Sequence, residues 1–351
     1  MKNILKPNKV PYPIPVPNNM GMVRYILALA VVIAHYNILT GGNIYFPFSS
    51  YVAVGGFFSL SGFLIYGSYL KKENFRTYIL SRMIRLLPAY FFIVLACAFG
   101  LFFVSGETVQ SYFANSEFWK YLGANLTFMN FLQPTLPGVF ESMEISTVNG
   151  SLWTLKVEWM LYLSVPLVAL LVKKIHGRAT LTFILIYAVS VAYRLLFRYL
   201  YAASGSEIYN ILGRQMFGQL TFFYCGVMIY YWYDVFMRYR WQLMTGALLL
   251  MLIPTDQYNL DILVDPVAFS ILVVGVSMTG RWATWEGRRD NVSYNMYLVH
   301  FPICQLAAYY NLKSYSGEWG AFLIVLTVTV LLSVFINRCI EKPIQKAVKR
   351  H

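Results

Sequence analysis

The sequence predicts an all-α, polytopic integral membrane protein with about ten transmembrane helices and both termini in the cytoplasm. Of its 351 residues, 58% are hydrophobic and only 12% are charged, whereas a soluble domain carries roughly twice that share of charge. The apolar residues fall in blocks of about 17 to 22, the length a helix needs to cross a bilayer. Basic residues gather between these blocks in alternate loops, as the positive-inside rule requires.

Ten such blocks are expected to cross the membrane: 22–39, 51–70, 86–104, 152–172, 179–200, 215–233, 241–254, 262–279, 293–312 and 318–337. Residues 1–21 form a cytoplasmic lead-in whose prolines cannot sustain a helix. Residues 341–351 form a basic cytoplasmic tail. Residues 22–340 are therefore expected to form one transmembrane domain.

The distribution of charge predicts the orientation. With a cytoplasmic N-terminus, one side receives basic clusters such as Lys71 and Lys72, while the other receives few, mainly Lys120, Arg198, Arg214 and Lys313. The net charge of +13 therefore reflects cytoplasmic loops. No nucleic-acid partner is expected.

Arg24 and His35 stand at the two ends of an apolar stretch in the first block. Eleven residues of α-helix turn through about 1100°, so the two side chains share a face, roughly 16 Å apart along the axis. Ionisable groups in such segments normally face the bundle or an aqueous cavity, and they mark function. The alternatives are that Arg24 snorkels as a membrane anchor and that His35 is a hydrogen-bonded packing residue.

Glu158 lies in the fourth block at a depth similar to that of His35, each counted from the outer end of its own block. A carboxylate at that depth could orient the imidazole and raise its basicity. The alternative is that Glu158 pairs with Lys156 or another buried donor and only holds helices together.

Further segments complete a pattern that runs along nearly the whole chain. Besides Arg-x10-His, they are GGFFSLSGFLI (55–65), YILSRMIRLLPAY (78–90), SLWTLKVEWMLYLSVP (151–166), SYNMYLVHFPI (293–303) and EKP (341–343). In this set and order the chain resembles the membrane-bound acyltransferase family 3, the sugar O-acyltransferases of bacterial envelopes. Trp153, Glu158 and Tyr162 match the family's W-S-L-x-V-E-x-x-F-Y pattern, while Thr154 and Leu161 depart from it.

The resemblance implies an O-acetyltransferase in the cell membrane of a bacterium. Such an enzyme moves an acyl group, usually acetyl, from cytosolic acyl-CoA to a hydroxyl of an envelope or secreted glycan, and so modifies polysaccharide. Acetyl-CoA would be a co-substrate rather than a bound cofactor. The expected partners are acyl-CoA, a glycan or lipid-linked saccharide and the bilayer. The sequence shows no metal-ligand cluster, so no metal dependence is expected.

His35 is the expected catalytic residue, together with Glu158. It would act as a general base on the sugar hydroxyl or carry the acyl group as an acyl-histidine; the sequence does not separate the two schemes. Arg24 and the i, i+3 pair Arg82 and Arg85 would bind the donor phosphates. For the arginine pair, the alternative is that any cytoplasmic loop is basic.

Four further residues are candidate pocket residues: Ser61, Trp153, Tyr162 and His300. Ser61 and Gly62 belong to a small-residue surface that allows close helix packing or forms a slot for the pantetheine arm. His300 is expected nearer the level of Arg24 than that of His35, lining the donor tunnel or making a structural hydrogen bond.

Two other classes of function remain compatible with the span count. A transporter of a small anionic or sugar-linked substrate would also need intramembrane charge and an aqueous path. A structural partner in polysaccharide assembly would need neither. Release of CoA thiol in the presence of an acceptor separates an enzyme from both.

Overall fold

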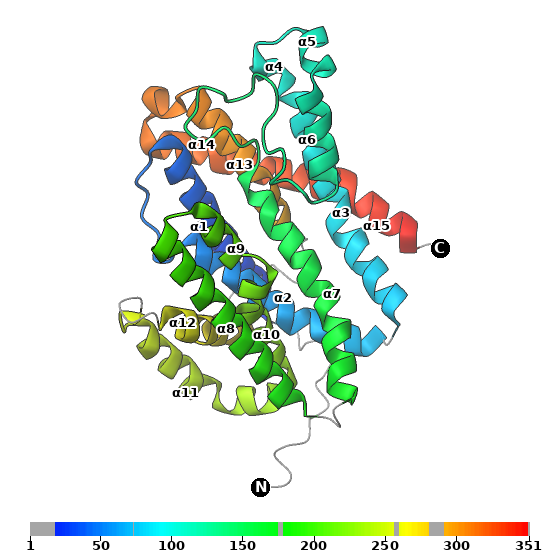
Figure 1. Cartoon of the computed structure of the whole chain (residues 1–351), viewed down its shortest axis with the longest axis vertical. Helices are drawn as coiled ribbons and strands as arrows, with labels where there is room; N and C mark the ends of the chain where they lie inside the picture. Colours follow the sequence, from blue (N-terminus) through cyan, green and yellow to red (C-terminus); the bar gives the residue numbers. More distant parts are fainter. Residues whose placement is uncertain (1–17, 73, 175–177, 256–259, 281–290, 350–351) are drawn as a thin grey trace. The chain divides into compact units, whose positions relative to one another are not determined.

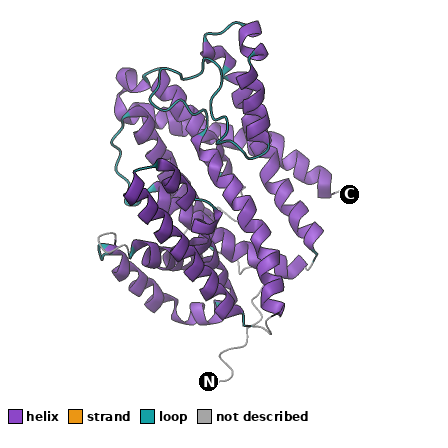
Figure 2. Cartoon of the chain, in the orientation of Figure 1, coloured by secondary structure: helices purple, strands orange, loops and turns teal. Residues whose placement is uncertain are grey.

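The computed structural model describes residues 18–349, with gaps at 73, 175–177, 256–259 and 281–290. Within the described part, every regular element is a helix (Figure 2). The all-helical fold class is thereby confirmed. Most of the predicted lead-in, residues 1–17, lies outside the described residues.

Seven helical segments of the described chain have the length and apolar composition to cross a membrane. They are Met20–Thr40, Ser50–Lys72, Phe75–Ser105, Gly150–Lys174, Ala179–Ser204, Asp261–Met278 and Leu312–Val348. Each overlaps one of the ten predicted spans. These segments support a multi-pass membrane protein.

The other three predicted spans also form helices, but each differs from a standard span. Helices α10 (Met216–Tyr231) and α13 (Ser293–Tyr309) have 16 and 17 residues, at or below the short end of the range for a crossing helix. Helix α11 (Tyr233–Met251) carries one acidic and two basic residues in its first half. The count of ten therefore stays a prediction.

The described chain divides into two compact units. Figure 1 labels the helices that belong to them along the chain. The first unit is made of the described residues within Met1–Leu27, Tyr51–Ile79 and Val157–Arg289, and the second of the described residues in the remaining segments. Helices α1 (Met20–Thr40), α3 (Phe75–Gly100) and α7 (Trp153–Lys174) contribute residues to both units.

The first unit packs α2 (Ser50–Lys72) with α8 (Ala179–Ser204), α9 (Glu207–Gly213), α10, α11 and α12 (Asp261–Met278). Small residues let α2 and α10 approach closely. A Cβ atom at Gly62 would lie 1.9 Å from the Phe223 carbonyl oxygen, and one at Gly226 would lie 2.0 Å from that of Ser59. Close helix packing is therefore what the small-residue surface around Ser61 provides here.

The second unit contains the segment between α3 and α7 together with the C-terminal helices. Its elements are α4 (Phe102–Ser105), α5 (Val109–Ala114), α6 (Ser116–Leu126), η1 (Gly150–Leu152), α13, α14 (Leu312–Ile336), η4 (Asn337–Glu341) and α15 (Lys342–Lys349). The buried Glu341 carboxylate accepts hydrogen bonds from the side-chain amides of Asn295 and Asn337, both at 3.0 Å. The EKP segment thus ties the end of α14 to α13.

Two prolines inside helices leave carbonyl groups that side chains of other segments satisfy. A proline has no N–H, so the carbonyl four residues earlier loses its helical donor. In α7, Pro166 frees the carbonyl of Tyr162 in this way. The hydroxyl of Tyr78, a fully buried side chain, donates to that oxygen at 2.9 Å. The sequence-distant start of α3 thus completes the backbone of α7 within the first unit.

This arrangement predicts that Tyr78 and Pro166 are energetically coupled. Tyr78→Phe removes only the hydroxyl and should cost about 1 kcal/mol, since it leaves a buried carbonyl unpaired. In a Pro166→Ala background the helix supplies its own N–H, so the same change should cost almost nothing. Detergent-induced unfolding of the four variants, followed by tryptophan fluorescence, gives the coupling energy.

Tyr315→Phe is the control, because the Tyr315 side chain is 84% exposed. An equal cost of Tyr78→Phe in both backgrounds would show that the hydroxyl does not act through the freed carbonyl.

Candidate active site

Two histidines meet inside the second unit. His35 lies on α1 and His300 on α13, and their Nδ1 and Nε2 atoms are 2.8 Å apart. The rings are nearly parallel, at 29°, with centroids 5.0 Å apart. His300 is completely buried, while His35 is half-buried. The pair thus has one completely buried member and one partly exposed member.

The neighbours of His300 assign the hydrogens of both rings. Its Nδ1 lies 3.1 Å from the Met296 carbonyl oxygen, which can only accept, so Nδ1 carries the hydrogen. In the neutral ring, Nε2 then holds a lone pair and accepts the hydrogen of His35 Nδ1. We therefore assign an unprotonated Nε2 to His35 from the hydrogen-bond network. That nitrogen is the atom a base or a nucleophile needs.

Aromatic and small residues hold the pair in place. The ring of Phe301 stands edge-on to that of His35, with centroids 5.0 Å apart. A Cβ atom at Gly150 would lie 2.7 Å from the Phe301 ring, so the backbone of η1 packs directly on Phe301. The apolar walls limit the positions that the imidazole of His35 can adopt.

The segment before α7 is fastened to α13 by a proline-freed carbonyl. Pro302 leaves the carbonyl of Leu298 without its helical donor. The side-chain amide of Asn149 donates to that oxygen at 2.9 Å. The side-chain oxygen of Asn149 accepts hydrogen bonds from the backbone N–H of Ser151 at 3.2 Å and from the Ser151 hydroxyl at 2.6 Å. Asn149 therefore caps η1 and anchors it to α13.

A second polar link lies beside His300. The hydroxyl of Thr154 donates to that of Tyr297 at 2.8 Å, and the Tyr297 ring lies 5.8 Å from that of His300 between centroids. Both side chains are buried. Tyr297 was not among the residues expected from the sequence. Its place one turn before His300 could have indicated it.

The structure corrects the predicted level of His300. Its direct contact with His35 shows that the expectation of a position nearer Arg24 was wrong. The prediction measured depth from the ends of two predicted spans as though both ends lay at membrane faces. Helix α13 begins at Ser293, as predicted, so the error lies in the assumption that the starts of the two helices are level.

Glu158 belongs to the first unit and accepts a hydrogen bond from the hydroxyl of Tyr162, one turn further along α7. The ammonium of Lys156 lies 4.6 Å from the ring centroid of Phe131 in the second unit. The structure thus joins two predicted residues, Glu158 and Tyr162, to each other. The pairing of Glu158 with His35 stays a prediction.

The remaining candidates lie on α1, α2, α3 and α7. Arg24 is half-buried in the first turns of α1, and Ser61 is half-buried on α2. On α3, Arg82 is half-buried, with Nε 3.4 Å from the Ser81 hydroxyl, and Arg85 is exposed. Trp153 is half-buried at the start of α7, directly after η1. Among the described residues, no three His, Cys, Asp or Glu side chains form a metal-type cluster.

The chain is similar to proteins of one enzyme family. A model of an acyltransferase domain matches residues 18–338. An O-acetyl transferase of Shigella phage Sf6 is 26% identical over 176 residues, 48% of this chain and 50% of the relative. Nodulation protein 10 of Rhizobium leguminosarum bv. viciae is 25% identical over 162 residues, 43% of each chain. The chain thus aligns with half or less of these curated relatives. No solved structure is significantly similar to it.

The described residues form a helical membrane fold that contains a histidine pair, and an unprotonated imidazole nitrogen has the chemistry to accept a proton or to attack a carbonyl. The family model covers nearly the whole chain. The chain belongs to the acyltransferase 3 family, which confirms the resemblance seen in its motifs.

The assigned hydrogens can be observed directly. The chain has only four histidines, so ¹⁵N-histidine spectra of the detergent-solubilised protein are tractable. We expect His35 and His300 both to give the Nδ1–H tautomer, and His300→Phe to shift the His35 signals by removing its acceptor. An Nε2–H tautomer for His35 would contradict the assignment.

Proposed function

We propose that this protein is an O-acetyltransferase that moves an acetyl group from acetyl-CoA to a hydroxyl of an envelope or secreted glycan. The observation that carries the proposal is the His35–His300 pair, because it leaves an imidazole lone pair on the half-buried ring. Family membership favours acyl transfer over transport. The relative named O-acetyl transferase supports oxygen as the acceptor atom.

In the proposed reaction, His35 Nε2 takes the proton of the sugar hydroxyl as the oxygen attacks the thioester carbonyl. The tetrahedral intermediate collapses, the C–S bond breaks, and the CoA thiolate recovers the proton from His35. While His35 is protonated, its Nδ1–H bond to His300 becomes charge-assisted and stronger. His300 thus fixes the ring and stabilises its cationic form.

The same lone pair could instead attack the thioester and form an acyl-histidine, which the hydroxyl then resolves. This variant uses the same atom and the same partner, so His35 is essential in both schemes. Acetyl label that stays on the protein without acceptor, and leaves when acceptor is added, would identify the two-step route.

The donor is proposed to arrive at the basic, cytoplasmic side of the membrane. Arg24, Arg82 and Arg85 would bind the phosphates of CoA, because a guanidinium pairs with phosphate through two parallel hydrogen bonds. Glu158, held by Tyr162, is proposed as the second catalytic group. Its role rests on its place in the family motif.

Replacing His35 should nearly abolish turnover. Because general-base assistance is worth about 10²–10⁴-fold, His35→Ala should lower acetyl-CoA turnover with extracted envelope glycans by at least about 10²-fold. The readouts are thiol release and acetyl label on the glycan, measured in nanodiscs.

Ile38→Ala is the matched control for His35→Ala, since Ile38 lies one turn further on the same helix and is 60% exposed. Wild-type rates in a folded His35→Ala protein would refute the mechanism.

The arginine pair of α3 should act on donor binding. Arg82→Gln and Arg85→Gln should each raise the KM for acetyl-CoA about tenfold, the equivalent of one charge-assisted hydrogen bond of about 1.4 kcal/mol. The kcat should change far less, because these groups bind the donor away from the reacting bond.

Arg76→Gln provides the comparison, because Arg76 is an exposed arginine at the start of the same helix. Equal KM effects at all three positions would show a general attraction of the basic segment for CoA rather than a binding pair.

A further inference from the structure

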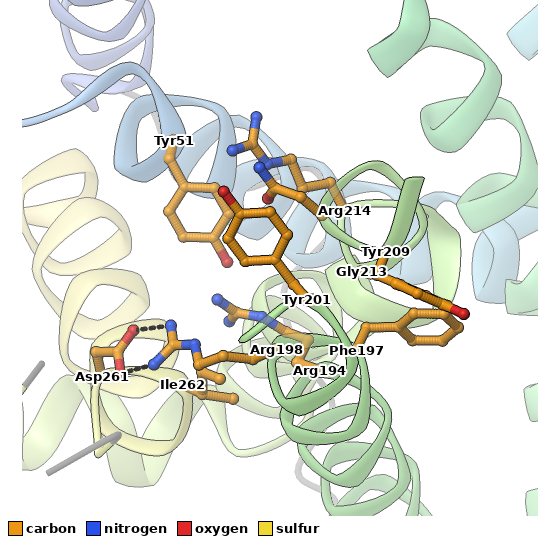
Figure 3. A pocket seen from close by; sticks show the side chains of 11 residues that line it. Tyr51, Arg194, Phe197, Arg198, Tyr201, Tyr209, Gly213, Arg214, Asp261 and Ile262 are labelled. Atoms are coloured by element: carbon orange, nitrogen blue, oxygen red, sulfur yellow. Dashed lines mark hydrogen bonds and ion pairs between the residues drawn. The ribbon is translucent and has the colours of Figure 1, made fainter. Parts of the chain in front are cut away.

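A cavity of about 420 Å³ opens within the first unit, and its polar lining is dominated by arginine (Figure 3). Arg194 and Arg198 come from α8, one turn apart, and Arg214 follows α9. The volume lies in the range of small-ligand sites. None of these arginines belongs to the donor-binding set expected from the motifs.

The cavity carries an excess of positive charge. Arg198 is neutralised by Asp261, its Nη1 and Nη2 lying 2.7 Å and 2.5 Å from the two carboxylate oxygens (Figure 3). Neither Arg194 nor Arg214 has a carboxylate within 4.0 Å among the described residues. Asp261 acts on Arg194, and Glu207 on Arg214, only across longer distances. The guanidinium groups of Arg194 and Arg214 are therefore not held in ion pairs and can bind an anion.

Two buried polar atoms on the cavity wall lack well-formed hydrogen bonds. Nη1 of Arg194 and the hydroxyl of Tyr51 are both shielded from solvent, and neither makes a hydrogen bond of good geometry within the described structure. The two side chains act on each other electrostatically. The Arg194 guanidinium lies over the Tyr51 ring, 5.1 Å from its centroid, so stacking holds it while leaving that donor unused. Unsatisfied buried donors are costly, and a bound oxyanion would satisfy them.

Aromatic rings complete the lining. Phe197, Tyr201 and Tyr209 line the cavity together with Tyr51, and the Tyr201 hydroxyl is held by Glu207 at 2.9 Å. Aromatic faces offer flat apolar surface that the C–H face of a sugar ring can cover, and the phenol hydroxyls can bond its oxygens. The Asn210 amide adds a donor and an acceptor. A charged sugar matches this lining better than an isolated inorganic ion.

The cavity lies at the end of α2 opposite its basic end. Tyr51 is the second residue of this 23-residue helix, and Lys71 and Lys72 are the last two. About 30 Å of helix separates them, close to the thickness of a bilayer core. By the positive-inside rule, the cavity opens on the outer side, where the proposed acceptor arrives and CoA does not.

We propose that this cavity binds an anionic group, a carboxylate or a phosphate, carried by the saccharide acceptor. The guanidinium groups of Arg194 and Arg214 bind the anion, and the aromatic rings hold the sugar that bears it. The identity of the ligand as acceptor rests on the proposed function. The binding of a charged saccharide does not depend on catalysis.

Calorimetry on the purified protein in phosphatidylcholine nanodiscs tests the proposal without turnover. The probes are trigalacturonate for carboxylate, glucose 1-phosphate for phosphate, and maltotriose as the neutral control. We expect at least one charged probe to bind more tightly than maltotriose. Its Kd should rise about tenfold in Arg194→Gln and in Arg214→Gln, and its affinity should fall with added salt.

Arg178→Gln is the matched control, because Arg178 is exposed just before the opposite end of α8, and its Kd should equal that of the wild type. Tyr51→Phe keeps the ring and removes only the buried hydroxyl, and it should weaken binding about threefold. If Arg194→Gln does not fold, the exposed Arg214 carries the test.

Three results would overturn the proposal. One is charged-saccharide affinity unchanged in both arginine variants. Another is CoA binding that Arg194→Gln abolishes, which would make this a donor site. The third is displacement of the saccharide by phosphatidylglycerol in the nanodisc, which would make it a lipid site. Arginine-dependent saccharide binding without any acetyl transfer would instead contradict the proposed function and leave the binding site standing.

Discussion

The need to satisfy every backbone hydrogen bond inside the protein governs this structure. In a bilayer core no water can pair with a free carbonyl, yet Pro166 and Pro302 each release one. The hydroxyl of Tyr78 donates to the first of these carbonyls in the first unit, and the side-chain amide of Asn149 donates to the second in the second unit. Each proline thereby specifies a contact between segments far apart in the sequence, and the second of these contacts anchors η1 beside the histidine pair.

The histidine pair shows that buried side-chain groups must also be paired by hydrogen bonds. A buried donor needs an acceptor, and His300 supplies a neutral one to His35. A neutral acceptor avoids the cost of burying an unpaired charge, and it leaves His35 Nε2 unprotonated in the resting state. A carboxylate in that position would favour the imidazolium instead and remove the lone pair. Two histidines therefore suit a ring that must accept a proton.

Several of the motif residues lie on the helices that both units share, while the others lie on α2, α13 and the C-terminal segment. Arg24 and His35 lie on α1, Arg82 and Arg85 on α3, and Trp153 and Glu158 on α7. These three helices contribute residues to each unit. The first unit holds the arginine-lined cavity, while the second holds the histidines. The proposed chemistry thus divides into an anion-recognising part and a proton-transferring part, connected by the helices that carry the motifs.

The sequence by itself determined the helical membrane fold, because the length and composition of apolar blocks follow directly from the bilayer's thickness. It also selected His35 and His300, because ionisable groups are rare in such blocks unless they act. It could not pair them, since the contact joins residues 265 positions apart and depends on how α1 and α13 pack. The sequence could not predict that Arg194, Arg198 and Arg214 meet either. They are separate charges along the chain, and only the packing of α8 and α9 brings them to one cavity. Local physics sets which segments enter the membrane, whereas the packing of side chains between helices decides which polar groups meet.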